Sequence, residues 1–168
     1  CLAIINALEK ISIPELSIKW PNDILSENKK IGGILIENFF KKSKINASII
    51  GVGLNLNQEK FEKLPKATSL KMVTGKKWTS QIILGILIPF FEEFLFENDL
   101  QDPTISEKYQ KKLWRRNKTL LFHKDGELHK GKLMGVDESG MIILEDQRQI
   151  ISKFNNSQIS IQYGDYLN

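Results

Sequence analysis

The sequence contains a single cysteine, Cys1, and only two histidines among 168 residues. One cysteine cannot form an intramolecular disulfide, and so few soft ligands do not make a structural zinc site. Long hydrophobic runs are absent as well. The most apolar stretch, residues 82–91, is about half as long as a bilayer span, and two glutamates follow it. The first residues carry no basic region of a signal peptide. These absences predict a cytoplasmic protein that does not interact with membranes.

Arginine is also scarce, because only 3 of the 24 basic residues are arginine and the others are lysine. Proteins that read nucleic acids rely on arginine for bidentate contacts. The lysines are scattered among asparagine and isoleucine, and the net charge is only +4. We therefore interpret the excess of basic over acidic residues as a compositional bias and expect no DNA binding. Apolar residues at 41% and charged residues at 26% are typical of a globular chain.

Two kinds of pattern divide the chain near Asn117. The first part combines helical spacing with strand-like runs, and the helical spacing of Leu2, Ile5 and Leu8 starts at once. Because the chain begins with Cys1, we expect the sequence to start inside a larger domain. Helices are expected at residues 2–11, 79–98 and 102–116, strands at 16–20, 30–40 and 44–57, and a long loop at 57–77.

The segment after Asn117 consists of short β-rich runs separated by turn signals. Five such runs in about 50 residues are typical of a small barrel. The sequence therefore predicts an α+β protein with domains at residues 1–116 and 117–168. The five strands are expected at residues 119–123, 128–136, 141–144, 149–152 and 159–163.

Three clusters in the first 57 residues have the residue types of a binding site. The first is KWPND at residues 19–23, where a strand ends in a cation, a large aromatic ring, a fixed turn and two short polar groups. A strand end with a lysine at the surface, a tryptophan in the core and an Asx turn would look the same.

The second cluster is KIGGILIE at residues 30–37, where Gly32 and Gly33 interrupt an apolar strand. Glycine is tolerated there at a bulge or where a ligand approaches the backbone closely. Lys30 follows Asp23 by seven residues, and its ammonium group can hold a carboxylate or a phosphate. Asp23 could fix this ammonium group or help to hold a magnesium ion. A bulged strand with an exposed lysine remains an alternative.

The third cluster is GVGLNLN at residues 51–57. It has only two of the three glycines of a Rossmann fingerprint, and no helix is expected after it. Gly51 and Gly53 would let a flat ligand lie against the backbone. Asn55 carries a donor and an acceptor, which suits the edge of an adenine ring.

In this order and at this spacing, the three clusters resemble the catalytic core of biotin protein ligases, the biotin–[acetyl-CoA-carboxylase] ligases. The ATSL sequence at residues 67–70, the helices after it and the β-rich end of the chain resemble the same family. The resemblance covers essentially the whole chain, and the set of three is specific. It implies a class II synthetase-like catalytic domain with a mixed sheet, followed by a small SH3-like barrel.

The resemblance also implies an activity. Such an enzyme converts biotin and Mg·ATP to biotinyl-5′-AMP and pyrophosphate, and then transfers biotin to a lysine of the carboxyl carrier domain of acetyl-CoA carboxylase. Lys30 would contact the biotin carboxyl group and the α-phosphate, and Asp23 would serve catalysis through the acceptor lysine or a metal. The protein itself is expected to hold no resident metal. The other implied residues are Gly33, Ile34, Leu35, Gly51 and Gly53 for biotin, and Lys19, Asn22 and Asn55 for the nucleotide.

The sequence departs from the family in one respect, because the Gly/Arg-rich biotin loop that precedes KWPND in the family does not occur in it. We therefore expect an incomplete biotin site in this chain alone. A lipoate ligase or octanoyl transferase and a non-catalytic binding module remain alternatives. KWPND argues against the former, and the missing loop favours the latter. Related enzymes dimerise through the region of residues 36–43, so a homodimer is a further hypothesis.

Overall fold

The computed structural model describes residues 1–62, 64–97 and 102–163. The described residues form two compact units. Residues 1–18 and 22–97 make up the first unit, and residues 19–21 and 102–163 make up the second. The expected division at Asn117 stays a prediction, although the second unit includes the helix before that residue. Asn98, the expected end of one helix, lies outside the described residues.

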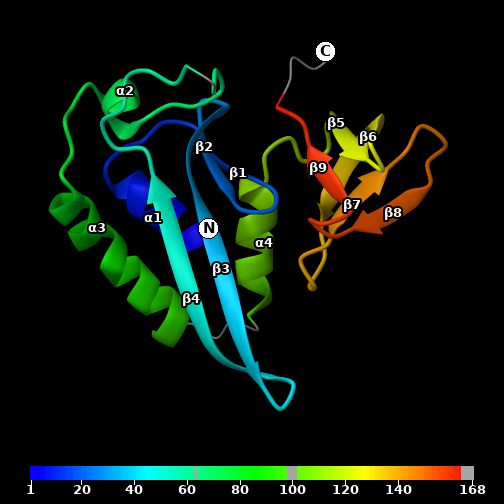
Figure 1. Cartoon of the computed structure of the whole chain (residues 1–168), viewed down its shortest axis with the longest axis horizontal. Helices are drawn as coiled ribbons and strands as arrows, with labels where there is room; N and C mark the ends of the chain where they lie inside the picture. Colours follow the sequence, from blue (N-terminus) through cyan, green and yellow to red (C-terminus); the bar gives the residue numbers. More distant parts are fainter. Residues whose placement is uncertain (63, 98–101, 164–168) are drawn as a thin grey trace. The chain divides into compact units, whose positions relative to one another are not determined.

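The first unit is built on a four-stranded sheet with the order β1-β2-β3-β4 (Figure 1). Helix α1 packs against α3, and its buried residues include Ile4, Ile5 and Leu8, which confirms the predicted helical spacing. The elements are α1 (Leu2–Lys10), β1 (Leu16–Lys19), β2 (Asp23–Ser26), β3 (Lys29–Lys41), β4 (Lys44–Leu54), α2 (Leu70–Thr74), α3 (Ser80–Glu92) and the π-helical segment η1 (Glu93–Glu97).

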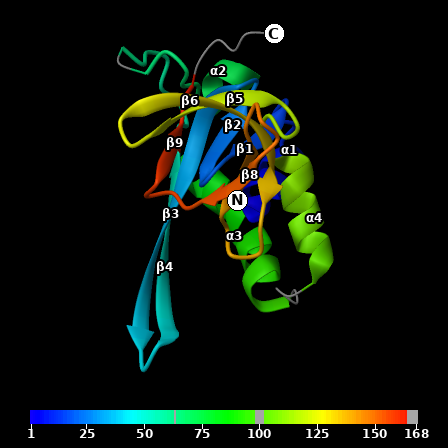
Figure 2. The same ribbon diagram turned by 90° about the vertical axis from the view of Figure 1, so that its right-hand side faces the viewer.

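Two tight turns connect the three antiparallel strands β2, β3 and β4. Glu27 and Asn28 have φ angles of 48° and 63°, and Lys42 and Ser43 have φ angles of 48° and 60°. Positive φ at both central residues is the conformation that suits the twist of a two-residue hairpin. The predicted hairpin of β3 and β4 is confirmed. Its turn projects beyond the other elements of the first unit in both views (Figures 1 and 2).

The distal half of this hairpin is exposed. Strand β2 pairs only with residues 29–33 of β3, so in the described sheet the rest of β3 is paired with β4 alone. The exposed apolar side chains on the hairpin are Leu35, Ile36, Phe39, Phe40, Ile45, Ile49 and Val52.

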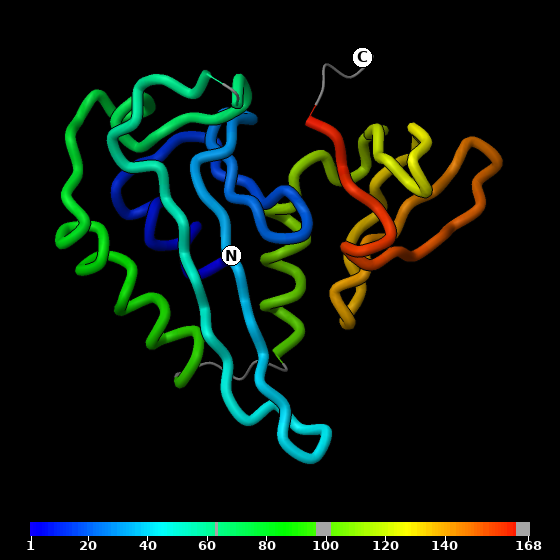
Figure 3. Tube along the Cα trace, viewed as in Figure 1, coloured from blue at the N-terminus to red at the C-terminus, as the bar shows by residue number. Residues whose placement is uncertain are grey.

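The connection from β4 to α3 differs from the predicted loop. It contains the short helix α2, which Figure 3 places along the path from the end of β4 to α3. The Ser69 hydroxyl accepts a hydrogen bond from the Met72 backbone N–H at 3.2 Å and caps the helix, while Gly75 ends it with a φ of 70°. A polar side chain at the start and a left-handed glycine at the end suffice to form one turn of helix here. The long loop predicted at residues 57–77 is therefore wrong at residues 70–74, which form this helix.

The second unit contains a helix and a five-stranded sheet with the order β8-β7-β6-β5-β9. Helix α4 ends before the predicted residue 116, because Leu113 already has an extended backbone. The five predicted strands are present with shifted ends, whereas closure into an SH3-like barrel stays a prediction. The elements are α4 (Pro103–Lys112), β5 (Thr119–Lys124), β6 (Glu127–Val136), β7 (Ile142–Glu145), β8 (Ile151–Phe154) and β9 (Ile159–Ile161).

Candidate functional site

The first unit brings Lys30 and Asp23 together. Asp23 begins β2 and is paired with Gly33 of β3, while Lys30 lies near the start of β3. The Lys30 Nζ atom is 2.5 Å from the Asp23 Oδ1 atom, and the two side chains are 43% and 15% exposed. The structure thus shows the first of the two alternatives for Asp23, in which its carboxylate fixes the Lys30 ammonium group. It leaves a paired cation and anion at the surface, where an anionic ligand can reach the ammonium group.

Gly33 leaves room for this ion pair. A Cβ atom at position 33 would lie 3.2 Å from the Asp23 Oδ1 atom and 3.6 Å from the Lys30 Cε atom. The first distance is tighter than ordinary packing and the second is an ordinary contact, so a side chain at position 33 would press against the Asp23 carboxylate. The absent side chain at position 33 thus places the ion pair on the face of the sheet to which this residue points.

The same face continues as an exposed strip along the hairpin. Gly33 is paired with Gly53 and Leu35 with Gly51, and side chains two residues apart in a strand share a face. Leu35 is 63% exposed, and both Gly51 and Gly53 are exposed. This face therefore presents one exposed aliphatic side chain beside two glycine positions that carry no side chain. Four of the residues predicted to bind biotin are therefore neighbours.

Ile34, the remaining residue predicted to contact biotin, differs from these neighbours. Its side chain is 6% exposed and belongs to the core, since it alternates with Gly33 and Leu35. Its backbone is bound to Asn22: the Ile34 N–H donates to the Asn22 carbonyl at 3.0 Å, and the Asn22 Nδ2 atom donates to the Ile34 carbonyl at 2.6 Å. In this structure the Asn22 amide therefore fixes the segment between β1 and β2 to β3.

Asn55 follows β4 and is bonded to backbone as well. Its Nδ2 atom donates to the Thr68 carbonyl at 2.9 Å and lies 3.5 Å from the Lys30 carbonyl. Thr68 belongs to the ATSL sequence, which forms a parallel bridge with β3 at Lys30 and Ala67. The expected contact between Asn55 and an adenine edge stays a prediction.

Lys19 belongs to the second unit. It is 6% exposed, and its Nζ atom lies 4.0 Å from the centroid of the Tyr163 ring. An ammonium group over an aromatic face is held by the negative potential of the ring. The role of Lys19 at the nucleotide stays a prediction.

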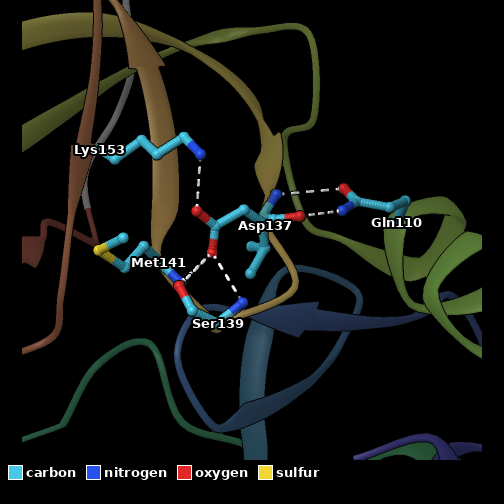
Figure 4. A network of polar contacts seen from close by, with 6 residues as sticks. Gln110, Asp137, Ser139, Met141 and Lys153 are labelled. Atoms are coloured by element: carbon cyan, nitrogen blue, oxygen red, sulfur yellow. Dashed lines mark hydrogen bonds and ion pairs between the residues drawn. The ribbon is translucent and has the colours of Figure 1, made fainter. Parts of the chain in front are cut away.

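Trp20, from the same KWPND sequence, is held by a turn of the second unit that sequence reasoning missed. The Trp20 Nε1–H donates to the Gly140 carbonyl at 2.9 Å. The turn is organised by the Asp137 carboxylate, which accepts hydrogen bonds from Ser139 and Met141 and pairs with Lys153 at 2.9 Å (Figure 4).

These contacts have an electrostatic consequence for Asp137. Hydrogen bonds from the Ser139 hydroxyl and from Lys153 hold the pKa of the Asp137 carboxyl group well below its usual range. Gln110 of α4 exchanges hydrogen bonds with the backbone of the neighbouring Val136, which fixes the end of β6 (Figure 4). The turn that accepts the Trp20 hydrogen bond is therefore held by the Asp137–Lys153 ion pair and by the hydrogen bonds with Gln110 of α4.

Within residues 1–62, 64–97 and 102–163, no three His, Cys, Asp or Glu side chains gather as metal ligands. No helix in the same part of the chain is long and apolar enough to cross a membrane.

Comparisons with known proteins place this chain among relatives of the biotin ligases. Residues 1–55 match the model of the biotin/lipoate A/B protein ligase family. The bifunctional ligase/repressor BirA of Bacillus spizizenii is 31% identical over 159 residues, which are 89% of this chain and 47% of that protein. The biotin–[acetyl-CoA-carboxylase] ligase of Paracoccus denitrificans is 29% identical over 144 residues, which are 81% of this chain and 60% of that protein.

The solved structures include a biotin protein ligase from Aquifex aeolicus in complex with biotin and ATP. It is 27% identical, has a TM-score of 0.77, and is matched over 96% of this chain and 68% of that chain. The chain spans about half the length of the BirA relatives that it matches. It is a homologue of the biotin protein ligases and covers a region that is like their catalytic domain.

Proposed function

We propose that this chain forms the part of a biotin protein ligase in which biotin is activated by ATP. One observation carries the proposal: the Lys30–Asp23 ion pair lies on the same face as the exposed strip of Gly33, Leu35, Gly51 and Gly53. A flat, weakly polar ring system can lie on bare backbone and an aliphatic side chain, while its carboxylate reaches the ammonium group. Biotin combines these two features.

The proposed first step joins the biotin carboxylate to ATP. A carboxylate oxygen attacks the α-phosphorus atom, pyrophosphate leaves, and biotinyl-5′-AMP forms. Lys30 lies opposite the negative charge that the carboxylate and the α-phosphoryl oxygens bring together in the transition state. A fixed cation at that position lowers the barrier, because its attraction grows with the developing charge.

Magnesium enters this proposal as part of the Mg·ATP substrate. The candidate site contains one carboxylate, Asp23, and that group is paired with Lys30. One carboxylate together with substrate phosphates is a common environment for Mg²⁺. It does not amount to a resident metal centre, so we assign no step to a protein-bound ion.

The proposed second step transfers biotin to a lysine of a carboxyl carrier protein. An acceptor lysine attacks the mixed anhydride as a neutral amine, and AMP leaves. In this step, an anionic adenylate binds Lys30, and the Asp23 carboxylate faces the incoming ammonium group. We therefore assign to Asp23 the role of orienting the acceptor lysine and accepting its proton.

Lys19, Asn22 and Asn55 are proposed to support the nucleotide end of the site. Asn22 would do so by fixing the segment between β1 and β2 to β3, and Asn55 by fixing the backbone around Lys30. The partner that we propose is the carrier domain of acetyl-CoA carboxylase, and the compartment is the cytoplasm. A homodimer through residues 36–43 is supported by the edge of β3, which β2 leaves uncovered beyond residue 33. Light scattering of the protein with biotin and ATP tests it, and a monomer at all concentrations would refute it.

The substrate class is tested by isotope exchange between ATP and pyrophosphate in the full-length gene product. We expect exchange that requires biotin and is not supported by lipoate or octanoate. Exchange with lipoate but not biotin would replace the proposal by a lipoate ligase. Absence of exchange with every acid, together with saturable biotin binding, would identify a binding module.

A further inference from the structure

We propose that Asn55 is a positioning residue for Lys30. The inference rests on the proposed function, because it concerns the lysine to which the adenylation step is assigned. It differs from the expectation that Asn55 reads the adenine edge, and the difference follows from where the side-chain amide is bonded.

The Asn55 Nδ2 atom faces two backbone carbonyl oxygens. It is 2.9 Å from the Thr68 oxygen and 3.5 Å from the Lys30 oxygen. A carboxamide nitrogen carries two N–H donors, so it can serve one carbonyl with each of them. The reversed amide orientation would place an oxygen against two oxygens. The side-chain donors are therefore directed at the backbone, and the bond to Thr68 is the stronger of the two.

Lys30 is the point at which these contacts meet. Its backbone N–H donates to the Lys66 carbonyl at 2.7 Å, and its carbonyl accepts from the Thr68 N–H at 2.8 Å. Asn55 itself is fixed from both sides, since its N–H donates to the Ile31 carbonyl and its carbonyl accepts from the Leu70 N–H, both at 2.9 Å. Asn55 thus joins the end of β4 to the segment that holds the Lys30 backbone.

These hydrogen bonds fix the backbone from which the Lys30 side chain extends. Thr68 is 2% exposed, so its carbonyl depends on protein donors rather than on water. Without the Asn55 side chain, the Thr68 carbonyl loses its donor, while the backbone bonds of Asn55 to Ile31 and Leu70 remain. The segment that holds the Lys30 backbone is then fixed less firmly to the end of β4. Small displacements of a catalytic group are costly, up to about 100-fold for about 1 Å.

The test is steady-state kinetics of biotin-dependent ATP–pyrophosphate exchange in the full-length gene product. We compare Asn55→Ala with Asn57→Ala. The Asn57 side chain donates to the Trp78 carbonyl at 2.7 Å and accepts from the Trp78 N–H at 2.9 Å, so its amide is bonded to Trp78 rather than to the segment around Lys30. Each protein is assayed with ATP and with ITP, which carries an oxo group in place of the adenine amino group.

A positioning role predicts that Asn55→Ala lowers kcat by about 10- to 100-fold, leaves the preference for ATP over ITP unchanged, and differs from an unaffected Asn57→Ala. A contact to adenine predicts the opposite: an unchanged kcat, a raised KM for ATP and a lost preference. The latter result, or a kcat equal to that of the wild type, would overturn the inference. Absence of exchange in the wild type would instead refute the proposed function.

A second measurement needs neither activity nor a folded variant. In the nucleotide-free wild-type protein, the side-chain amide protons of Asn55 should exchange slowly with solvent in NMR experiments, and they should stay protected when ATP is added. Fast exchange without nucleotide, followed by protection on addition of ATP, would show that the side-chain amide of Asn55 hydrogen-bonds the adenine base, and it would overturn the inference.

Discussion

Replacing Gly32 by alanine should destabilise the first unit, because the new Cβ atom has no room. It would lie 2.5 Å from the Gly53 carbonyl oxygen, 2.5 Å from the Leu54 Cδ2 atom and 3.4 Å from the Leu54 Cα atom. The Leu54 side chain can rotate away, but the Gly53 oxygen is backbone within the β3–β4 ladder. The two strands must therefore shift, at a cost of about 1–3 kcal/mol for an overpacked core.

The chain provides matched controls on the same two strands. A Cβ atom at Gly51 would be 3.6 Å from its nearest neighbour, and one at Gly53 would be 3.9 Å away. Neither residue has a positive φ, so alanine there should leave stability unchanged or raise it by about 0.4–1 kcal/mol. The comparison separates a local clash from the general effect of a glycine-to-alanine change.

The assay is thermal unfolding followed by circular dichroism. At about 2–4 °C per kcal/mol for a chain of this size, Gly32→Ala should lower Tm by about 2–12 °C. A Gly32→Ala protein as stable as Gly51→Ala would refute the packing argument. If Gly51→Ala keeps its stability but binds biotin more weakly, the proposed ligand face gains support that does not depend on folding.

Three further predictions concern other parts of the chain. Asp137→Asn should lower Tm at pH 7. The pKa of the Asp137 carboxyl group is about 3.9 in the unfolded chain and lower in the folded protein, so the higher Tm of the wild type should disappear as the pH falls below about 4. A higher Tm of the wild type that persists at low pH would contradict the assigned charge. Burial raises the pKa of Tyr109 to about 12, so absorbance titration should show a late tyrosinate step that Tyr109→Phe lacks, and the same late step in the variant would refute the assignment. Ser69→Ala removes the α2 cap and the bond from Ser69 to the Gln58 carbonyl, so denaturant unfolding should reveal a loss of about 1 kcal/mol; unchanged stability would show that the cap contributes nothing.

Periodicity and turn signals in the sequence predicted most of the elements. The helix at the start, the long hairpin and the five short strands of the second unit all follow from side-chain patterns that repeat locally. Helix α2 was missed because a single turn has no periodicity, although Ser69 before it and Gly75 after it are its cap signals.

Contacts between two side chains in the candidate site could be predicted from the sequence, whereas contacts between a side chain and the backbone could not. Asp23 and Lys30 are charged and close in sequence, so their contact could be expected from spacing. The partners of Trp20 and Asn55 are carbonyl oxygens of Gly140 and Thr68, and a backbone acceptor leaves no signature in the residue type. Such contacts depend on the tertiary fold, which explains why the adenine was the only partner that sequence reasoning suggested for Asn55.

The central claim is that the ammonium group of Lys30 activates biotin, and the formation of biotinyl-5′-AMP by the full-length gene product tests it most directly. Lys30→Ala should reduce the initial rate by about 100-fold or more, as expected for the loss of a fixed charge at a reacting phosphate. Lys29→Ala is the matched control, since Lys29 is exposed at the neighbouring position, and it should leave the rate unchanged. Undiminished adenylate synthesis by Lys30→Ala would contradict the account.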